Sequence, residues 1–445
     1  MIEQLLDVAR RRADGGADGL WRRVERTSVA FEWGRLKAAA VTEETGANLR
    51  VCHGGRVGVA GTTAAEAAAD ALVERALASA ALGEPLDLGF PPATPLPPLT
   101  TFFAPAAEAS LDTLIRLGAG LLERLARDGC RVNVAIERET AETNVANTAG
   151  AAGRYRSTAV AVSAEVWRIA GDDVLVLGDA FEGADLPGEE TLARIVDAID
   201  DRLTRALTIV TPPEGTLPVI FTPPGLEALL LPVTQGLSGK AVLQGISPLG
   251  GQVGETVFDP RFSVTDDPLL AGRAASRPLD DECVPSHVTR LVECGVVRQF
   301  IYDLETAARA KTRSTGHGRR RVFGKPVPAY TNLVLGEVAR GERGRDQRWG
   351  ELGGGLVRDV TDGLLVDELI GVGQGNVIGG AFSHPVALAY RIERGEITGR
   401  VKDAAVAGNA YELWKRVGGF GTDARWTSGR YAPSVRLDGV SVARR

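Results

Sequence analysis

The sequence contains few of the residues that form disulfides or hold metal ions. It has four cysteines and four histidines among its 445 residues. The cysteines are scattered along the chain and form no Cys-x-x-Cys pair: Cys52, Cys130, Cys283 and Cys294. This pattern indicates neither a disulfide framework nor a zinc knuckle.

Long apolar runs and basic clusters are also missing. No stretch reaches the ~18 consecutive apolar residues that a transmembrane helix needs, and charges interrupt the apolar positions of the first 16 residues, unlike in a signal peptide. The formal net charge is −6, and the densest basic run is only Arg319–Arg321. We therefore expect a cytoplasmic protein that binds neither membranes nor nucleic acid.

The remaining composition, 44% hydrophobic and 24% charged, is typical of a globular protein with two or three domains. Apolar spacing predicts a first helix, and short alternating runs up to Thr62 then predict an antiparallel meander. Seven prolines between residues 85 and 105 predict an extended connector. A helix, three strands and another helix follow, and we divide the chain into residues 1–84, 85–105, 106–210 and 211–445.

The region after residue 211 opens with one helix and continues as short strand-like runs with hairpin turns. Pro223 and Pro224 end the first strand, and apolar residues then recur at helical spacing from Leu226 to Leu237, which predicts a buried helix. Strands after a single helix favour a mostly antiparallel, barrel-like domain. The predicted fold class is α+β, with an antiparallel sheet and helices in the amino-terminal part.

Several segments resemble the TldD/PmbA family of metalloproteases and their partner subunits. The segments are SGKAVLQGISPLGG, RPLDDECVPSHVTR and RSTGHGRR in the carboxy-terminal half, and GRLKAAAVTEETGANLRV near the amino terminus. Metal-binding members of this family carry His-Glu-x-x-x-His on the helix before the first of these segments. The resemblance places the two histidines on Leu230 and Gln235 and the glutamate on Leu231. A third ligand, a cysteine, falls on Ser428.

Those substitutions remove the donors that zinc requires. Catalytic zinc needs about three N, S or O ligands and an open position for water, whereas leucine has no lone pair and an amide is a poor ligand. The chain therefore resembles the metal-less PmbA (TldE) type of subunit. This resemblance implies no catalytic residue and no cofactor here, and a heterodimer with a zinc-bearing TldD-type subunit that cleaves peptides or peptide-like conjugates. Our chain would shape the chamber, with Gln235 as a polar contact.

Three further residues are candidates for binding substrate or partner. His317 lies in the loop RSTGHGRR, where the family has Asn or His beside the site, and a surface loop is the alternative reading. Arg319 and Arg320 can bind a carboxylate through two hydrogen bonds each, or they form a solvated charge cluster.

An acidic triplet, Asp280, Asp281 and Glu282, stands where the family commonly has Asp-Asp-Glu-Gly. Three carboxylates can bind a hard cation, but without a second acidic cluster a loop held by backbone hydrogen bonds is favoured. Asp281 and Glu282 also remain candidates for substrate or partner contact. Cys283 replaces the glycine, and a nucleophile near His287 or a small buried residue are both open.

Two other functions remain open. The first alternative to the metal-less subunit is a homodimeric binding or scaffold protein without hydrolytic activity. The second is a metal-independent hydrolase that uses Cys283 or Ser428.

Overall fold

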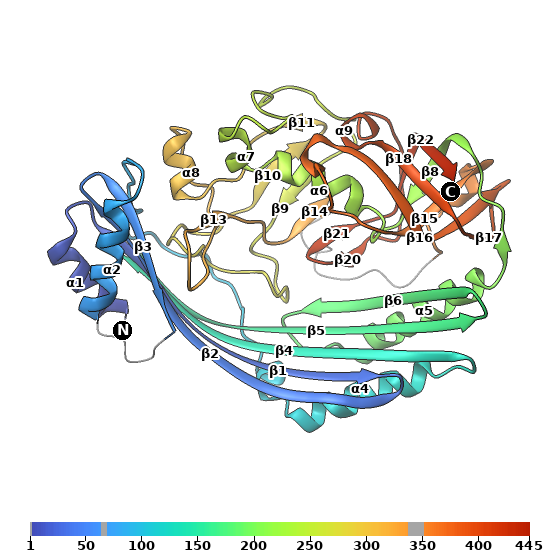
Figure 1. The fold of residues 1–445 in the computed structure, drawn as a ribbon, viewed down its shortest axis with the longest axis horizontal. Coiled ribbons are helices and arrows are strands. Elements are labelled where there is room, and N and C mark those ends of the chain that lie inside the picture. Colours follow the sequence, from blue (N-terminus) through green and yellow to red (C-terminus); the bar gives the residue numbers. More distant parts are fainter. Residues whose placement is uncertain (1, 64–68, 337–350) are drawn as a thin grey trace.

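The protein is described by a computed structural model that covers residues 2–63, 69–336 and 351–445. It has two parts (Figure 1). A long, curved sheet with helices on its outer side forms the amino-terminal part, and a β-rich carboxy-terminal part lies over the other side of that sheet. The mixture of antiparallel sheets and helices confirms the predicted α+β class.

The amino-terminal sheet has six antiparallel strands in the order β3-β2-β1-β4-β5-β6. Tight turns set its hairpins: Trp33 and Gly34 have φ of 53° and 81°, and Gly54 and Gly55 have φ of 57° and 67°. Two successive positive φ values are what a two-residue hairpin turn of type I′ requires. The strands are β1 (Ala17–Glu32), β2 (Arg35–His53), β3 (Arg56–Thr62), β4 (Cys130–Asn147), β5 (Ala152–Ala170) and β6 (Asp173–Gly183).

Helices cover the two ends of this sheet and form two separate cores. At one end, α1 (Ile2–Arg12) and α2 (Ala69–Ala81) pack on the β1–β3 side. At the other end, α3 (Ala104–Glu108), α4 (Leu111–Leu125) and α5 (Glu189–Ala206) cover alternate apolar residues of β1, β4 and β5. β1 and β4 are long enough to contribute to both cores: Ala17 and Ala146 lie in the first, and Val29 and Val134 lie in the second.

In the carboxy-terminal part, five strands close into the predicted barrel. Their order is β15-β8-β22-β18-β16, and β16 pairs again with β15. These strands are β8 (Gly215–Phe221), β15 (Asp362–Leu369), β16 (Ala381–Glu393), β18 (Ala404–Asn409) and β22 (Val435–Arg444). Three further strands extend this sheet: β7 (Ile209–Val210), β17 (Glu396–Val401) and β19 (Val417–Phe420).

The helix α6 (Glu227–Gly236) lies where the leucine spacing predicts a buried helix. Its Leu229 and Val233, and Leu226 just before it, share the main core with inward-facing barrel residues. Trp414 fixes the helix by donating from its indole N–H to the Leu229 carbonyl at 3.1 Å, and the Tyr411 hydroxyl donates to the Pro232 carbonyl at 2.8 Å.

A second sheet of six short strands, in the order β11-β10-β9-β14-β21-β20, joins the barrel to the amino-terminal part. Its strands are β9 (Val264–Asp266), β10 (Thr289–Glu293), β11 (Val296–Val297), β14 (Leu333–Leu335), β20 (Arg425–Thr427) and β21 (Arg430–Ala432). The remaining elements are short: α7 (Gly239–Leu243), α8 (Leu304–Arg309), α9 (Ala410–Leu413), β12 (Gly318–Arg319), β13 (Val327–Pro328), and the 3-10 turns η1 (Leu356–Asp359) and η2 (Val377–Gly379). Across the described ranges, no helix is long and apolar enough to cross a bilayer.

Candidate functional site

The three positions of α6 that align with the metal motif have different surroundings. Leu230 is 5% exposed and packs in the main core, while the Gln235 side chain is exposed to solvent. Leu231 borders a small cavity of about 120 Å³. In the described part of the chain, no group of three or more His, Cys, Asp or Glu side chains is placed to hold a metal ion. The donor set on α6 does not fit zinc.

The small cavity beside Leu231 is lined on its other side by Gln374, Phe382 and His384. The His384 ring stacks on Phe382 with centroids 6.0 Å apart. Partial burial lowers the pKa of His384, since the charged imidazolium loses hydration there. This cavity therefore presents a neutral imidazole and apolar carbon next to α6.

His317 is buried, and both of its ring nitrogens have partners. Nε2 lies 3.0 Å from the Asp266 carboxylate, and Nδ1 lies 2.9 Å from the Thr315 hydroxyl. Asp266 also accepts hydrogen bonds from the backbone N–H and hydroxyl of Thr331, both at 2.8 Å. The structure thus places His317 within a network that joins the loop to β9, away from solvent.

Arg320 and Glu282 lie in a second buried network that connects the two parts of the protein. Arg50 on β2 donates to both Asp18 oxygens at 3.0 and 2.6 Å and to Glu282 at 2.6 Å. Arg320 donates to Asp18 at 2.5 Å. Burial opposes the ionisation of Asp18, but Arg320 and Arg50 outweigh it and hold its pKa below the ordinary value. All four side chains are at most 1% exposed.

The rest of the acidic triplet accepts hydrogen bonds from the backbone. Asp280 accepts from the N–H groups of Glu282, Val284 and Gly318 at 2.8 to 2.9 Å. Asp281 accepts from the Arg320 N–H at 2.8 Å and lies 3.5 Å from the guanidinium of Arg319, whose side chain is 40% exposed. The triplet therefore forms a loop held by backbone hydrogen bonds, and Arg319 is a half-buried cation beside it.

Cys283 packs among apolar side chains, including Leu20, Val145 and Leu279, and is 3% exposed. Burial raises the pKa of its thiol, because the thiolate would lose hydration. His287 is exposed and lies nearest the Pro285 carbonyl, 3.5 Å from its Nδ1. The surroundings of Cys283 are those of an inert buried thiol rather than of a nucleophile.

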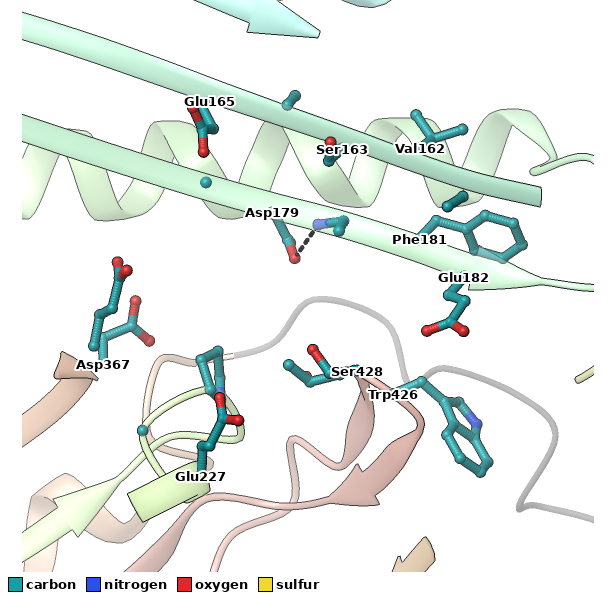
Figure 2. Close-up of a pocket in the computed structure, with 18 of the residues that line it drawn as sticks. Val162, Ser163, Glu165, Asp179, Phe181, Glu182, Glu227, Asp367, Trp426 and Ser428 are labelled. Carbon is teal, nitrogen blue, oxygen red and sulfur yellow. Dashed lines mark hydrogen bonds between the residues drawn. The ribbon is translucent and has the colours of Figure 1, made fainter. Parts of the chain in front are cut away.

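A cleft between the two parts of the protein contains one of the predicted positions, Ser428. It has a volume of about 540 Å³ and is lined by β5 and β6 on one side. The other side is formed by the β20–β21 turn with Ser428, the segment that leads into α6, and the end of β15. Figure 2 shows Asp179 and Glu182 of β6 facing Ser428 and Glu227 across this space.

Asp179 forms ion pairs with arginines from both parts of the protein. Arg425 of β20 lies 3.0 Å from both Asp179 oxygens, and Arg194 and Arg202 of α5 lie 3.2 and 3.6 Å away. Burial opposes the ionisation of Asp179, yet the three cations hold its pKa below the ordinary value. Arg202 also pairs with Asp367 at 3.0 Å, so the ion pairs continue into β15.

The cleft mouth has exposed carboxylates and one aromatic wall. Glu165, Glu182 and Glu368 are exposed there, and Trp426 carries Arg273 over its ring at 4.0 Å. Burial, followed by the nearby Asp367 and Glu165 charges, raises the pKa of Glu368. The opening of the cleft, here called the mouth, is therefore acidic. The buried carboxylates Asp179 and Asp367 below it, here called the floor, are paired with arginines.

Of the predicted positions, only Ser428 lines this cleft. Asp179, Trp426 and the glutamates come from segments far apart in the chain, and no sequence motif marks them. The alternation in STAVAVSAEVWRI does predict which side chains of β5 share a face. This alternation does not predict which segment of the chain lies across the cleft from that face.

Comparisons with known proteins agree with this architecture. Residues 214–444, more than half the chain, match the PmbA/TldA metallopeptidase C-terminal domain, and residues 17–80 match domain 1 of the same family. The solved structure of TldE from Thermococcus kodakarensis superposes with a TM-score of 0.87 over 99% of both chains, at 22% identity. That likeness supports the fold.

Curated relatives match over part of their length. A metalloprotease TldD homolog of Haemophilus influenzae is 30% identical over 47% of this chain and 42% of its own. A metalloprotease PmbA homolog of the same organism is 26% identical over 51% of this chain and 46% of its own, and a metalloprotease of Methanothermobacter thermautotrophicus is 29% identical over 55% and 51%. The matched region thus spans about half of each relative. On the family-domain matches, the chain belongs to the PmbA/TldA metallopeptidase family, also called TldD/PmbA.

Proposed function

We propose that this chain is the metal-less subunit of a heterodimeric zinc metallopeptidase of the TldD/TldE type. The observation that carries the proposal is the set of side chains on α6. Leu230 is a core residue, Leu231 lines a small cavity and Gln235 faces solvent, so the helix offers no converging ligands. A TldD-type partner with the His-Glu-x-x-x-His motif would provide the zinc, which activates water and polarises the scissile carbonyl.

The contribution of this chain would be to hold an extended peptide in the cleft. β6 and β20 are the terminal strands of their sheets, and residues of both strands line the cleft. An extended peptide can add to such an edge through main-chain hydrogen bonds, which need no particular side-chain sequence. A volume of about 540 Å³ is also in the range of binding sites for small molecules and short peptide-like conjugates.

The cleft residues limit what this chain can do alone. Ser428 is exposed at the β20–β21 turn, but no histidine is among the described residues that line the cleft, so Ser428 has no imidazole base there. Cys283 is buried and its thiol pKa is raised. Neither residue has the surroundings of an activated nucleophile, which favours the subunit function over a metal-independent hydrolase.

The test is to purify this chain alone and after co-expression with a family member that has the zinc motif. We expect no stoichiometric zinc and no peptidase activity in the isolated chain. The co-purified complex should contain about one zinc per heterodimer and cleave an unstructured peptide, with activity abolished by a chelator. Zinc bound stoichiometrically by the isolated chain, or chelator-resistant cleavage by it, would disprove the proposal.

A further inference from the structure

A row of polar side chains on the sheet lies beside the loop of the acidic triplet. Arg22 of β1, Thr143 of β4 and Tyr155 of β5 are directly opposite one another in the strand pairing, so their side chains share one face. Leu279 lies against Gly153, two residues before Tyr155 on the same face, and belongs to the apolar cluster on which Tyr155 packs. The row therefore lies where the two parts of the protein meet.

Arg277, two residues before Leu279, is a buried cation with unused donors. It is 4% exposed, and its Nε and Nη2 are buried without a hydrogen-bond partner in the described part of the chain. Buried donors are nearly always paired, because an unpaired one loses its bonds to water without replacement. Nε and Nη2 form the edge of a guanidinium that can donate two parallel hydrogen bonds to a carboxylate. The Nε of Arg22 is likewise buried without a partner, although its Nη2 lies 3.1 Å from Glu139.

The Tyr155 hydroxyl lies among these cations. Burial and the nearby Asp281 carboxylate raise the pKa of the phenol. The guanidinium groups of Arg277, Arg319 and Arg22 oppose that shift. Charges act strongly on one another only at short distances, so three arginines from separate segments of the chain surround one hydroxyl. That hydroxyl is itself a hydrogen-bond donor.

The charges around Tyr155 leave an excess of positive charge. Glu139 does not neutralise Arg22 by itself, since it pairs with both Arg22 and Arg26. Two carboxylates of the acidic triplet, Asp280 and Asp281, also act on this group. Counting Arg26, four arginines thus face three carboxylates. One added negative charge balances the group, which a carboxylate supplies and a doubly charged phosphate exceeds.

We propose that Arg277, Arg22 and Tyr155 form a binding site for one carboxylate group, with Arg319 beside its entrance. Arg277 donates two hydrogen bonds from Nε and Nη2, and the Tyr155 hydroxyl donates another. The two Arg277 nitrogens are shielded from solvent in this structure, so binding includes a side-chain movement. The side chain suited to move is Arg319, which is 40% exposed and held by a long ion pair of 3.5 Å to Asp281.

The site lies outside the cleft but on the same face of β5. Ala161, the nearest cleft residue of β5, is six residues from Tyr155, which is roughly 20 Å along a strand. The carboxyl terminus of an extended peptide can reach the site from the cleft, and a free small carboxylate is the other source. The inference goes beyond the proposed function. The isolated chain tests it without zinc or a partner, so either proposal can fail alone.

Sodium acetate is the first probe. At ~50 mM it should raise the urea midpoint of the isolated wild-type chain relative to sodium chloride of equal ionic strength, because a ligand that binds only the folded state stabilises it. Arg277→Gln should abolish this shift and still fold, since it removes a buried charge that lacks hydrogen-bond partners. Tyr155→Phe, which keeps the ring, should reduce the shift. The control Arg154→Gln, next to Tyr155 but 74% exposed on the other face of β5, should respond like the wild type.

Two labelled peptides separate the sources of the carboxylate. Both have about eight residues of alternating Gly and Ser, and one has a free carboxyl terminus while the other is amidated. Fluorescence anisotropy with the isolated chain should give about tenfold tighter binding of the free acid, and Arg277→Gln should remove that difference. Equal binding of the two peptides with the acetate shift intact would keep the site and assign it to a free small carboxylate.

Three results would each overturn the proposal. The first is a wild-type chain whose urea midpoint acetate does not raise. The second is an equal acetate shift in wild type and Arg277→Gln. The third is an Arg277-dependent shift that is larger with inorganic phosphate than with acetate, since the site would then prefer a different anion.

Discussion

Two of the contacts between the two parts of this protein differ from each other: one is closed and one is open. At the closed contact, Asp18 and Arg50 of the sheet meet Glu282 and Arg320 of the carboxy-terminal part, and all four side chains are buried. At the open contact, Asp179 of β6 meets Arg425 beside a cleft of about 540 Å³. Both contacts use ion pairs, but only the second leaves room for a ligand.

The comparison of the closed and the open contact distinguishes residues that stabilise the fold from residues that can bind a substrate. The motif residues of the family resemblance, Asp281, Glu282, His317 and Arg320, lie in the closed contact or in the network beside it. Asp281, Glu282 and His317 have hydrogen-bond partners within the chain. Arg320 pairs with Asp18 through one nitrogen, while its Nε and Nη1 have no hydrogen-bond partner in the described part of the chain. The cleft is instead lined by edge strands, whose backbone groups remain available to a peptide.

The largest expected effect comes from opening the closed contact. Arg50→Met should lower the free energy of unfolding by about 3–5 kcal/mol, because it removes one of the two cations that keep the buried Asp18 ionised and the buried hydrogen-bond donor of Glu282. Urea unfolding at neutral pH measures the change. The matched control is Arg23→Met, which breaks the exposed Arg23–Glu43 pair and should cost at most about 1 kcal/mol. Equal losses in the two variants would contradict the structural importance of the closed contact.

Asp179→Asn tests the open contact and should cost less, about 2–3 kcal/mol, because water from the cleft can hydrate the released arginines. The control Asp200→Asn removes an exposed pair with Arg127 and should change stability by less than about 1 kcal/mol.

The cost of Asp179→Asn should also depend on pH. The folded pKa of Asp179 is below its ordinary value of 3.8, so its contribution is fully present above that pH and is lost as the pH falls through the folded pKa. The urea midpoints of wild type and variant should therefore converge only below pH 3.8. Convergence near neutral pH would contradict the ion-pair explanation.

These contacts also show where sequence reasoning succeeds and where it stops. The buried helix α6 and the barrel-like region follow from local periodicity, and the structure has them. Of the predicted hairpin turns, the one at Gly395 joins β16 to β17, whereas Asp438-Gly439, which also predicts a turn, lies within β22 at an irregularity in its pairing with β8. The sequence makes the acidic triplet and Arg320 candidates for binding, because it does not show whether a charged residue contacts a substrate or another part of the same chain. Arg320 and Asp18 are 302 residues apart, and Asp179 and Arg425 are 246 apart. No local pattern records such pairings, so neither contact could be predicted.

Filling the cleft should affect binding rather than stability. Ser163 of β5 lines the cleft, and Ser163→Trp should lower kcat/KM of the zinc-bearing complex for an unstructured peptide by about tenfold or more, while the zinc content and urea midpoint stay unchanged. Ile169→Trp, at an exposed position of β5 outside the cleft, is the control and should stay close to wild type. If both variants cleave the peptide equally well, this cleft does not hold the substrate.

The smallest effect should have the opposite sign to that of Asp179→Asn, although both residues lie at the same cleft. Partial burial and the neighbouring Asp367 and Glu165 raise the folded pKa of Glu368 above its ordinary 4.5, so ionised Glu368 costs the folded state free energy. Glu368→Gln should therefore stabilise the protein by a few tenths of a kcal/mol at neutral pH and low salt, since the group is exposed and screened.

The stabilisation by Glu368→Gln should disappear below pH 4.5, where the carboxyl is protonated in both folded and unfolded chains, and it should shrink as salt is added. Differential scanning calorimetry of wild type and variant at two salt concentrations measures it, with the exposed Glu396→Gln as control. A destabilised Glu368→Gln variant would mean that this carboxylate has a favourable partner in the cleft. The carboxylates at the mouth of the cleft would then be paired with cations, as Asp179 is on its floor. The two regions of the cleft would then not differ in charge.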